Sequence, residues 1–288
     1  MISCKSKKIG FIVDSASCIK QNQYDDVYVV PLCINISNDE TNKIYRDTDK
    51  NFTLDFDKII KQKDKINVTT AQTPVSDMIE ACKIMSEKYD EVYVLPISRC
   101  LSSCIDTWKV IEKNFPKINV IQYKDFCIGL NWDIPLIKHN FETTRIDKNL
   151  LSDFFEKKIK NNRLGFAIVN DISWLMKGGR LGLFKGSITK LLGLKPMIFF
   201  NHDLFIYHAV ARNYKNFFDK ISKYLEKNFP KKKINRILVL HNNNDDLEII
   251  KKMVQNNWPN VVLEIINLPT VFLVHTGPNI IGIYFDLV

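Results

Sequence analysis

The amino-acid sequence predicts a two-domain α/β protein, with a mainly parallel sheet and flanking helices first and a mixed or antiparallel sheet second. In the first half, short apolar runs alternate with helical patterns, as in sheets built from right-handed crossovers. In the second half, strand-like runs are joined partly by tight turns such as Asn201-His202-Asp203. A chain of 288 residues, 45% of them hydrophobic, is long enough for two cores.

The first domain is expected to alternate strands with helices. A helix over residues 53–62 is predicted to begin at Thr53, and Ser76 is predicted to cap a second helix. One face of that second helix is apolar at helical spacing, which is typical of core packing, and carries Met78, Cys82, Met85 and Tyr89. Strands are expected at residues 9–13, 27–36, 91–97 and 118–123.

The polar stretch of residues 143–149 leads into an amphipathic segment and predicts a boundary between two domains, residues 1–150 and 151–288. In the second domain, helices are expected at residues 214–228 and 245–255. Strands are expected at residues 164–170, 196–201, 204–211, 237–241, 261–266 and 281–285.

Charge and cysteine content narrow the class of protein. The formal net charge is +9, but the positive residues are scattered and Lys outnumbers Arg, so nucleic-acid binding is not expected. The seven cysteines lack the spacing of a zinc site and are expected to be free thiols, with no metal bound. No apolar run approaches a membrane span and residues 1–8 lack a signal-peptide core, so we expect a soluble cytoplasmic protein.

Three apolar runs in the first hundred residues end in hydroxyl-rich turns. They are FIVDSAS, INVTTAQT and VYVLPISRCLSS, ending at Ser17, Thr73 and Ser103. The carboxyl ends of parallel strands form the ligand crevice of an open α/β sheet, and the N-termini of the following helices attract anions. Neutral hydroxyls suit a small carboxylate better than a polyphosphate. Ser98, Thr69 and Thr70 are therefore candidate carboxylate-binding residues, with simple helix capping as the alternative role for each.

Several familiar catalytic motifs are absent from the sequence. There is no phosphate-binding G-x-x-x-x-G-K-S/T loop and no G-x-G-x-x-G after the first expected strand. There is no G-x-S-x-G elbow, so nothing in the sequence supports Ser98 as an esterase nucleophile. We therefore expect no nucleotide cofactor and no catalytic residue.

Two segments of the second domain are candidates for binding. Gly178 and Gly179 permit close backbone approach, and the following Arg180 offers a fork to an anion or an acidic partner. The alternative is a helix C-cap followed by a core helix. His275 is expected in a polar turn after an apolar strand, where it can hydrogen-bond a carboxylate, whereas a core-satisfied histidine is the default for a single His.

These segments, in this order, resemble the DegV family of bacterial fatty-acid-binding proteins over nearly the whole chain. In the first domain, the family patterns D-S-T-x-D-L, T-S-Q-P-S and I-S-S-G-L-S-G-T-Y are similar to residues 14–19, 70–74 and 97–105. In the second, K-G-G-R-I, L-N-I-K-P-I, K-V-R and H-T-G-P are similar to residues 177–181, 192–197, 210–212 and 275–278.

The resemblance implies one long-chain fatty acid between two α/β domains, with its carboxylate at the sheet ends and its tail in a protein tunnel. Family members of this kind are carrier subunits of a fatty acid kinase. They present the acid to a separate ATP-dependent kinase subunit and pass the acyl phosphate towards phospholipid synthesis. The expected ligand is thus a fatty acid, and the chain is not expected to be an enzyme. A stand-alone phosphotransferase or hydrolase is the alternative.

The resemblance also assigns residues. Thr70 and Ser98 match the hydroxyls that bind the carboxylate, with His275 as a further donor nearby. Arg99 replaces a serine of the family pattern and either brings a positive charge beside the acid or turns to solvent. The residues matched to the cleft rim are Asp14, Ser15 and Gly277, and those matched to the kinase-facing surface are Arg180 and Arg212.

Two further expectations follow. Asn279 replaces a glycine of the family pattern, and Asn tolerates positive φ better than most residues. Because a carrier must load and unload lipid, a transient, salt-sensitive contact with a membrane surface is also expected, and the lysine run of residues 231–233 is a candidate for it.

Overall fold

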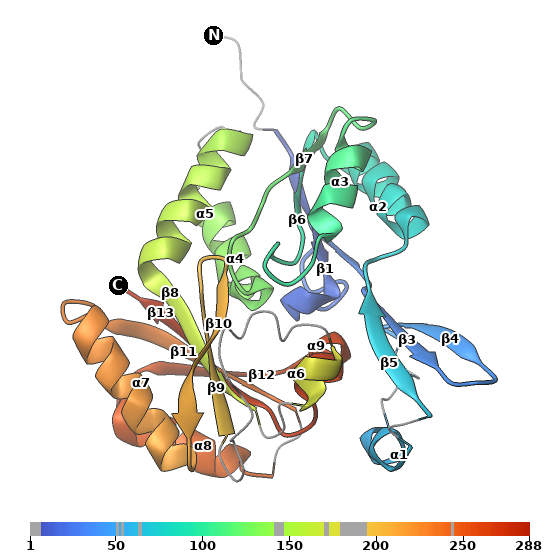
Figure 1. Ribbon diagram of the computed structural model, residues 1–288. Coiled ribbons are helices and arrows are strands. Elements are labelled where there is room, and N and C mark those ends of the chain that lie inside the picture. The colour runs from blue at the N-terminus through green and yellow to red at the C-terminus, as the bar shows by residue number, and fades with distance from the viewer. Residues whose placement is uncertain are drawn as a thin grey trace. The chain divides into compact units, whose positions relative to one another are not determined.

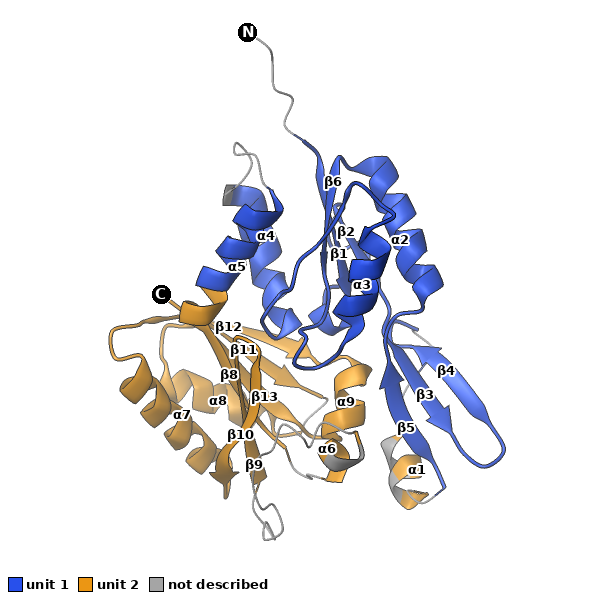
Figure 2. Cartoon of the chain, turned by 45° about the horizontal axis from the view of Figure 1, so that its top comes forward, with its two compact units in different colours: residues 1–53, 63–157 blue, residues 54–62, 158–288 orange. Residues whose placement is uncertain are grey.

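The computed structural model describes residues 7–49, 52, 55–62, 65–140, 147–169, 173–178, 195–242 and 245–288. The chain divides into two units, residues 1–53 with 63–157 and residues 54–62 with 158–288 (Figure 2). The division at 157/158 falls inside the helix Lys148–Asn162 (α5). The predicted fold class, with a parallel sheet in the first unit and a mixed sheet in the second, is confirmed.

The described part of the first unit contains a four-stranded parallel sheet in the order β2-β1-β6-β7. Strands β1, β6 and β7 are labelled in Figure 1. Its two central strands are buried along almost their whole length. Such strands read as continuous apolar runs, because both faces of a parallel sheet are covered. The four strands are Ile9–Asp14 (β1), Val27–Val30 (β2), Glu91–Leu95 (β6) and Ile118–Val120 (β7).

Helices cover both faces of this sheet. Val75–Lys88 (α2) and Cys104–Glu112 (α3) lie on one side, and Leu130–Asn140 (α4) and α5 lie on the other (Figure 2). The apolar face predicted for α2 is buried at Met78, Cys82 and Met85. The N-cap of α2 is Pro74, so the prediction of Ser76 is wrong. The Ser76 hydroxyl instead contacts Asp77, 3.1 Å away.

The described residues of the first unit also form a three-stranded antiparallel sheet, in the order β4-β3-β5. The single strand expected over residues 27–36 is therefore wrong, because β2 and β3 belong to different sheets. Pro31 lies between them and has no N–H to continue a ladder. The three strands are Cys33–Ser37 (β3), Asn42–Arg46 (β4) and Asn67–Ala71 (β5).

The helix expected over residues 53–62 is shorter in the structure. Phe56–Lys61 (α1) begins after Asp55, whose side chain accepts a hydrogen bond from the Lys58 N–H at 2.9 Å. Thr53, the predicted N-cap, lies outside the described residues. An aspartate satisfies the free N–H groups of a first helical turn at least as well as a threonine.

The second unit is built on a sheet whose described strands have the order β10-β9-β8-β13-β11-β12. Strands β11 and β12 are parallel, and the other pairs are antiparallel. The predicted hairpin is confirmed, with positive φ at His202 and Asp203. The six strands are Arg163–Ile168 (β8), Lys195–Asn201 (β9), Leu204–Ala211 (β10), Ile234–His241 (β11), Val262–Asn267 (β12) and Ile281–Leu287 (β13).

Tyr214–Asn228 (α7) and Leu247–Asn257 (α8) supply the apolar side chains that cover this sheet. The core packs Phe217 and Ile221 of α7 and Ile250 of α8 with inward-facing residues of β8, β11 and β13. Helix α7 has the bounds that the sequence predicts. None of the described helices combines the length and apolar character that crossing a bilayer requires.

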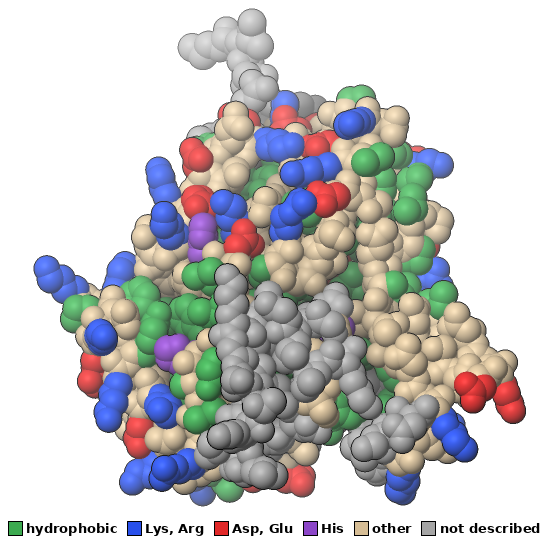
Figure 3. Space-filling model, viewed as in Figure 1, with side chains coloured by type: hydrophobic (Ala, Val, Ile, Leu, Met, Phe, Trp, Pro, Cys, Tyr) green, Lys and Arg blue, Asp and Glu red, His purple; other side chains and the backbone are tan. Residues whose placement is uncertain are grey.

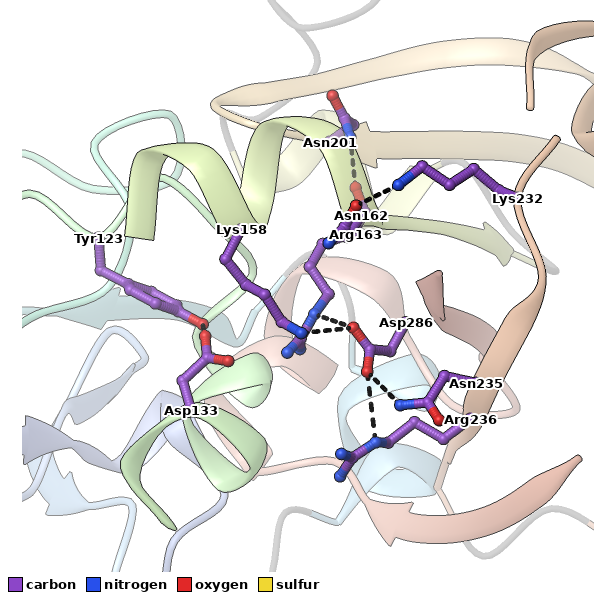
Figure 4. Close-up of polar contacts among 10 residues, drawn as sticks. All are labelled: Tyr123, Asp133, Lys158, Asn162, Arg163, Asn201, Lys232, Asn235, Arg236 and Asp286. Carbon is purple, nitrogen blue, oxygen red and sulfur yellow. Dashed lines mark hydrogen bonds and ion pairs between the residues drawn. The ribbon is translucent and has the colours of Figure 1, made fainter. Parts of the chain in front are cut away.

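A buried carboxylate joins four elements of the second unit. Asp286 of β13 is fully buried and pairs with Arg163 at the start of β8, which is 1% exposed, with 2.7 Å between Nε and Oδ1 (Figure 4). Lys158 of α5 and Arg236 of β11 approach the same carboxylate at 3.5 and 3.4 Å, and the Asn235 amide donates to it at 2.9 Å. One buried anion therefore compensates the buried guanidinium of Arg163 and two partly exposed cations.

We expect Asp286→Asn to lower the free energy of unfolding by about 3–5 kcal/mol, because it leaves the buried guanidinium of Arg163 without its counter-charge. Urea denaturation measures the change. Asp219→Asn, at an exposed position of α7, is the control and should change stability by less than about 0.5 kcal/mol. Equal unfolding free energies for the two variants would contradict the assignment.

Candidate functional site

The two central strands of the first unit end side by side. In the parallel pair β1 and β6, Val13 lies opposite Leu95. The short 3-10 helix Ser15–Ser17 (η1) follows β1, and the turn of residues 96–103 follows β6. This edge is where ligands bind in open α/β sheets, and the sequence-based expectation for FIVDSAS and VYVLPIS refers to it.

Asp14 connects the two strand ends. Its Oδ2 accepts a hydrogen bond from the Ile97 N–H at 2.6 Å, and its Oδ1 accepts one from the Ala16 N–H at 3.1 Å. The side chain is 2% exposed. Ser15, which the resemblance also assigns to the cleft rim, is buried too, and its hydroxyl accepts from the Leu32 N–H at 3.1 Å.

Burial raises the pKa of Asp14 from 3.8 to about 7, although the two amide donors act in the opposite direction and Asp47 adds to the rise. Nearby thiols are also perturbed. Burial raises the pKa of Cys104 to about 12 and that of Cys127 well above its ordinary value. Because a thiolate is the reactive form of cysteine, these two thiols are poor nucleophiles at neutral pH.

Ser98 lies in the turn after β6 and is 2% exposed. Its Oγ lies 3.3 Å from Cys100 Sγ, and its carbonyl accepts from the N–H groups of Leu101 and Ser102 at 2.9 and 3.1 Å. Residues 101–103 belong to the turn, because α3 begins at Cys104. The N-cap of α3 is Ser103, so Ser98 does not have the helix-capping role that was the alternative to binding a carboxylate.

Arg99 points to the surface. Its guanidinium pairs with both carboxylate oxygens of Asp106 on α3, at 2.6 and 3.0 Å, and each side chain is about half exposed. Of the two orientations that the sequence left open for Arg99, the structure has the one directed to solvent.

Thr70 has a different setting from the one expected. It lies within β5, opposite Ile34 of β3, so INVTTAQT does not end a strand of the parallel sheet as predicted. Sequence alone does not reveal this, because a strand's partners are set by tertiary pairing. The side chain is half-buried.

The segments of Thr70 and Ser98 nevertheless meet the same helix. Gln72, two residues after Thr70, accepts a hydrogen bond from the Thr107 hydroxyl of α3 at 3.0 Å. Arg99, the residue after Ser98, pairs with Asp106 of the same helix. Two consecutive residues of α3 therefore hold the two hydroxyl-bearing segments. Asp106 and Thr107 carry no motif that identifies them in the sequence.

His275 lies in the last turn of the helix Thr270–Thr276 (α9), so the predicted strand and turn are wrong. A short apolar run cannot be assigned to strand or helix by periodicity alone. Gly277 follows α9 with a φ of +72°, and a Cβ there would lie 2.4 Å from Trp174 in Ser173–Lys177 (α6). A Cβ on Gly178, at the end of α6, would lie 2.2 Å from His275 Nδ1. The two glycines allow α6 and α9 to pack closely and place His275 against Gly178.

Of the three remaining predicted residues, the structure describes two. Arg180 lies outside the described residues, whereas Arg212 is exposed after β10. Asn279 has a φ of +64°, so the backbone conformation expected there is confirmed. Within the described ranges, no group of three or more His, Cys, Asp or Glu side chains is arranged to hold a metal ion.

The sequence of this chain is similar to those of known proteins. A model for the DegV family, described as uncharacterised proteins, matches residues 8–287. A DegV domain-containing protein of Mycoplasma genitalium is 27% identical, with 94% of this chain and 95% of that protein covered. A DegV domain-containing protein of Clostridium acetobutylicum is 26% identical, with 96% and 98% covered.

Two solved structures show the same fold over nearly the whole chain. A fatty-acid-binding DegV family protein from Thermus thermophilus superposes with a TM-score of 0.77 at 21% identity, covering 98% of this chain and 100% of its own. A stearic-acid-binding protein from Eubacterium ventriosum gives a TM-score of 0.76 at 22% identity, covering 96% and 98%.

We expect Gly178→Ala to displace the His275 ring, because the new methyl group would overlap Nδ1. NMR should show a change in the His275 imidazole resonances, and the free energy of unfolding should fall by about 1–3 kcal/mol. In Gly282→Ala, the matched control on β13, the Cβ would lie 3.1 Å from the nearest side-chain atom, in Leu240, and the His275 resonances should stay in place. Unchanged resonances in Gly178→Ala would refute the close packing.

Proposed function

The chain belongs to the DegV family, and from this premise we propose that it binds one long-chain fatty acid and presents the carboxylate to a separate ATP-dependent kinase subunit. The acyl phosphate formed there is passed towards phospholipid synthesis. The observation that carries the proposal is the similarity, over almost the full chain, to solved proteins described as fatty-acid-binding. The chain itself acts as a carrier without catalytic activity.

In this proposal the carboxylate is held by the hydroxyls of Ser98 and Thr70, with His275 as a further donor. The support is that Ser98 is buried at the ligand-binding edge of the sheet, and that both hydroxyl-bearing segments attach to α3. Hydroxyl donors compensate the carboxylate for the water that it loses. Arg99 would have to leave Asp106 before it could reach the ligand.

The apolar tail supplies most of the proposed affinity. Burial of each methylene is worth roughly 0.8 kcal/mol, so a sixteen-carbon chain contributes on the order of 10 kcal/mol before the entropy of binding is subtracted. Against that sum, each hydroxyl contributes about 1 kcal/mol net. The head-group contacts therefore mainly orient the acid so that the kinase can reach it.

The contacts with partners are also proposals. Arg180 and Arg212 would face the kinase subunit, and the protein would act in the cytoplasm with transient visits to a membrane surface. The lysines of residues 231–233 are exposed. In Figure 3, positive side chains over the α7 region stand among negative and apolar ones, a mixed surface that does not favour nucleic acid.

A stand-alone phosphotransferase or hydrolase is the alternative, and no observation favours it. The sequence lacks a phosphate-binding loop, and the raised pKa values of Cys104 and Cys127 make those thiols unreactive. ATP turnover or ester hydrolysis by the isolated chain, abolished in Ser98→Ala, would reverse this conclusion.

Native mass spectrometry and lipid analysis of a solvent extract test the ligand directly. We expect the purified protein to carry a fatty acid, or to take up one from a series of saturated and unsaturated acids of different lengths. No acyl chain in the extract, together with no binding of the added acids, would refute the proposed function.

We expect Ser98→Ala and Thr70→Ala each to weaken fatty-acid binding by about 1–3 kcal/mol, because each removes a donor to the carboxylate. Titration calorimetry with palmitic acid measures the change. Ser76→Ala removes an exposed hydroxyl from α2 of the same unit and is the matched control, expected to bind as the wild type does. If Ser98→Ala and Thr70→Ala bind like this control, the hydroxyls do not hold the acid.

A further inference from the structure

The turn of residues 96–103, which contains Ser98, is held from two sides. On one side, Asp14 accepts a hydrogen bond at 2.6 Å from the N–H of Ile97, the residue before Ser98. On the other side, a hydrogen bond joins the backbone of Ser98 to the side chain of Cys127. Cys127 belongs to the short 3-10 helix Cys127–Gly129 (η2), which packs against η1. The carboxylate of Asp14 therefore lies in the interior, at the point where the chain leaves β6 for the turn.

We propose that Asp14 is a positioning residue for the fatty-acid carboxylate site, because it fixes the start of the turn that places the Ser98 hydroxyl. This inference rests on the proposed function. Each carboxylate oxygen of Asp14 holds a different strand end. One accepts a hydrogen bond from the Ala16 N–H after β1, and the other accepts one from the Ile97 N–H after β6. Loss of the carboxylate would leave two N–H groups without an acceptor and free the turn to move.

The same geometry makes binding sensitive to pH. Among the described residues, the ionisable groups that interact electrostatically with Asp14 are Asp47 after β4, Cys104 of α3 and Cys127 of η2. The two thiols stay neutral near pH 7, and no Lys or Arg in the described ranges forms an ion pair with Asp14. A ligand carboxylate at Ser98 adds a negative charge close to a carboxyl whose pKa burial already raises to about 7.

The sign of the effect follows from the repulsion between the two carboxylates. A bound acid disfavours the ionised form of Asp14 and raises its pKa further, so binding takes up a proton. Affinity is then highest below pH 7 and falls as the pH rises through neutrality. A rise of one pKa unit on binding corresponds to a roughly fivefold weaker affinity at pH 8 than at pH 6.

The first experiment needs no variant. We expect the amide resonances of Ile97 and Ala16 in the ligand-free wild-type protein to shift together with pH, with a midpoint near 7, because both N–H groups bond the titrating carboxyl. Added palmitic acid should move the midpoint to higher pH. Resonances that do not titrate between pH 5 and 9, or a midpoint that palmitic acid leaves unchanged, would overturn the inference.

The second experiment compares variants by calorimetry with palmitic acid at pH 6 and pH 8. Asp14→Asn keeps the shape and one acceptor but cannot ionise, so its affinity should be the same at both values. Asp133→Asn is the matched control: Asp133 is also fully buried in the first unit and accepts from the Tyr123 hydroxyl at 2.7 Å (Figure 4). This control should keep the wild-type pH profile.

Asp14→Ala removes both acceptors and should bind about tenfold more weakly at pH 6. Wild-type affinity in Asp14→Ala, or a wild-type pH profile in Asp14→Asn, would refute the positioning role. Failure of the wild-type protein to bind any fatty acid would instead refute the proposed function, and this inference with it. In that case the ligand-free titration of Ile97 would still show whether Asp14 holds the turn.

Discussion

The pairing of β1 with β6 is the constraint on which the candidate site depends. Its register sets Val13 opposite Leu95, so Asp14 comes level with the residues that leave β6. A slip of one residue would turn every side chain of a strand to the other face and carry Asp14 away from the Ile97 N–H. The register is well determined because β1 and β6 are central and bury apolar side chains on both faces.

The sequence predicts those parts of the structure that are determined by the pattern of neighbouring residues. Strand β10 and helix α7 have the predicted bounds, since strand and helix periodicity are both strong there. The errors arise where tertiary context decides. Pro31 divides one apolar run between two sheets, β5 pairs with β3, and the apolar run before His275 is a helix.

In the candidate site, too, local patterns are predictable from the sequence and tertiary contacts are not. The position of Ser98 at a strand end follows from the rule that ligands bind where parallel strands end. The partners that hold its neighbours are distant in sequence: Asp14 is 83 residues from Ile97, and Thr107 is 35 residues from Gln72. No motif reports such pairs, and only the folded chain reveals them. The assignment of Ser98, Thr70 and His275 to a bound carboxylate stays a prediction.

On the proposed function, the charges around Ser98 suit a carrier that must also release its ligand. The cation next in the chain, Arg99, is held at the surface by Asp106, and the interior beside Ser98 contains an acid and neutral thiols. A buried ion pair with the fatty acid would add a contact that must break before the acid leaves, and breaking such pairs is energetically unfavourable. Hydroxyls can orient the carboxylate without that barrier. On the proposed function, therefore, the tail provides the affinity, and the uncharged donors leave the head group open to transfer.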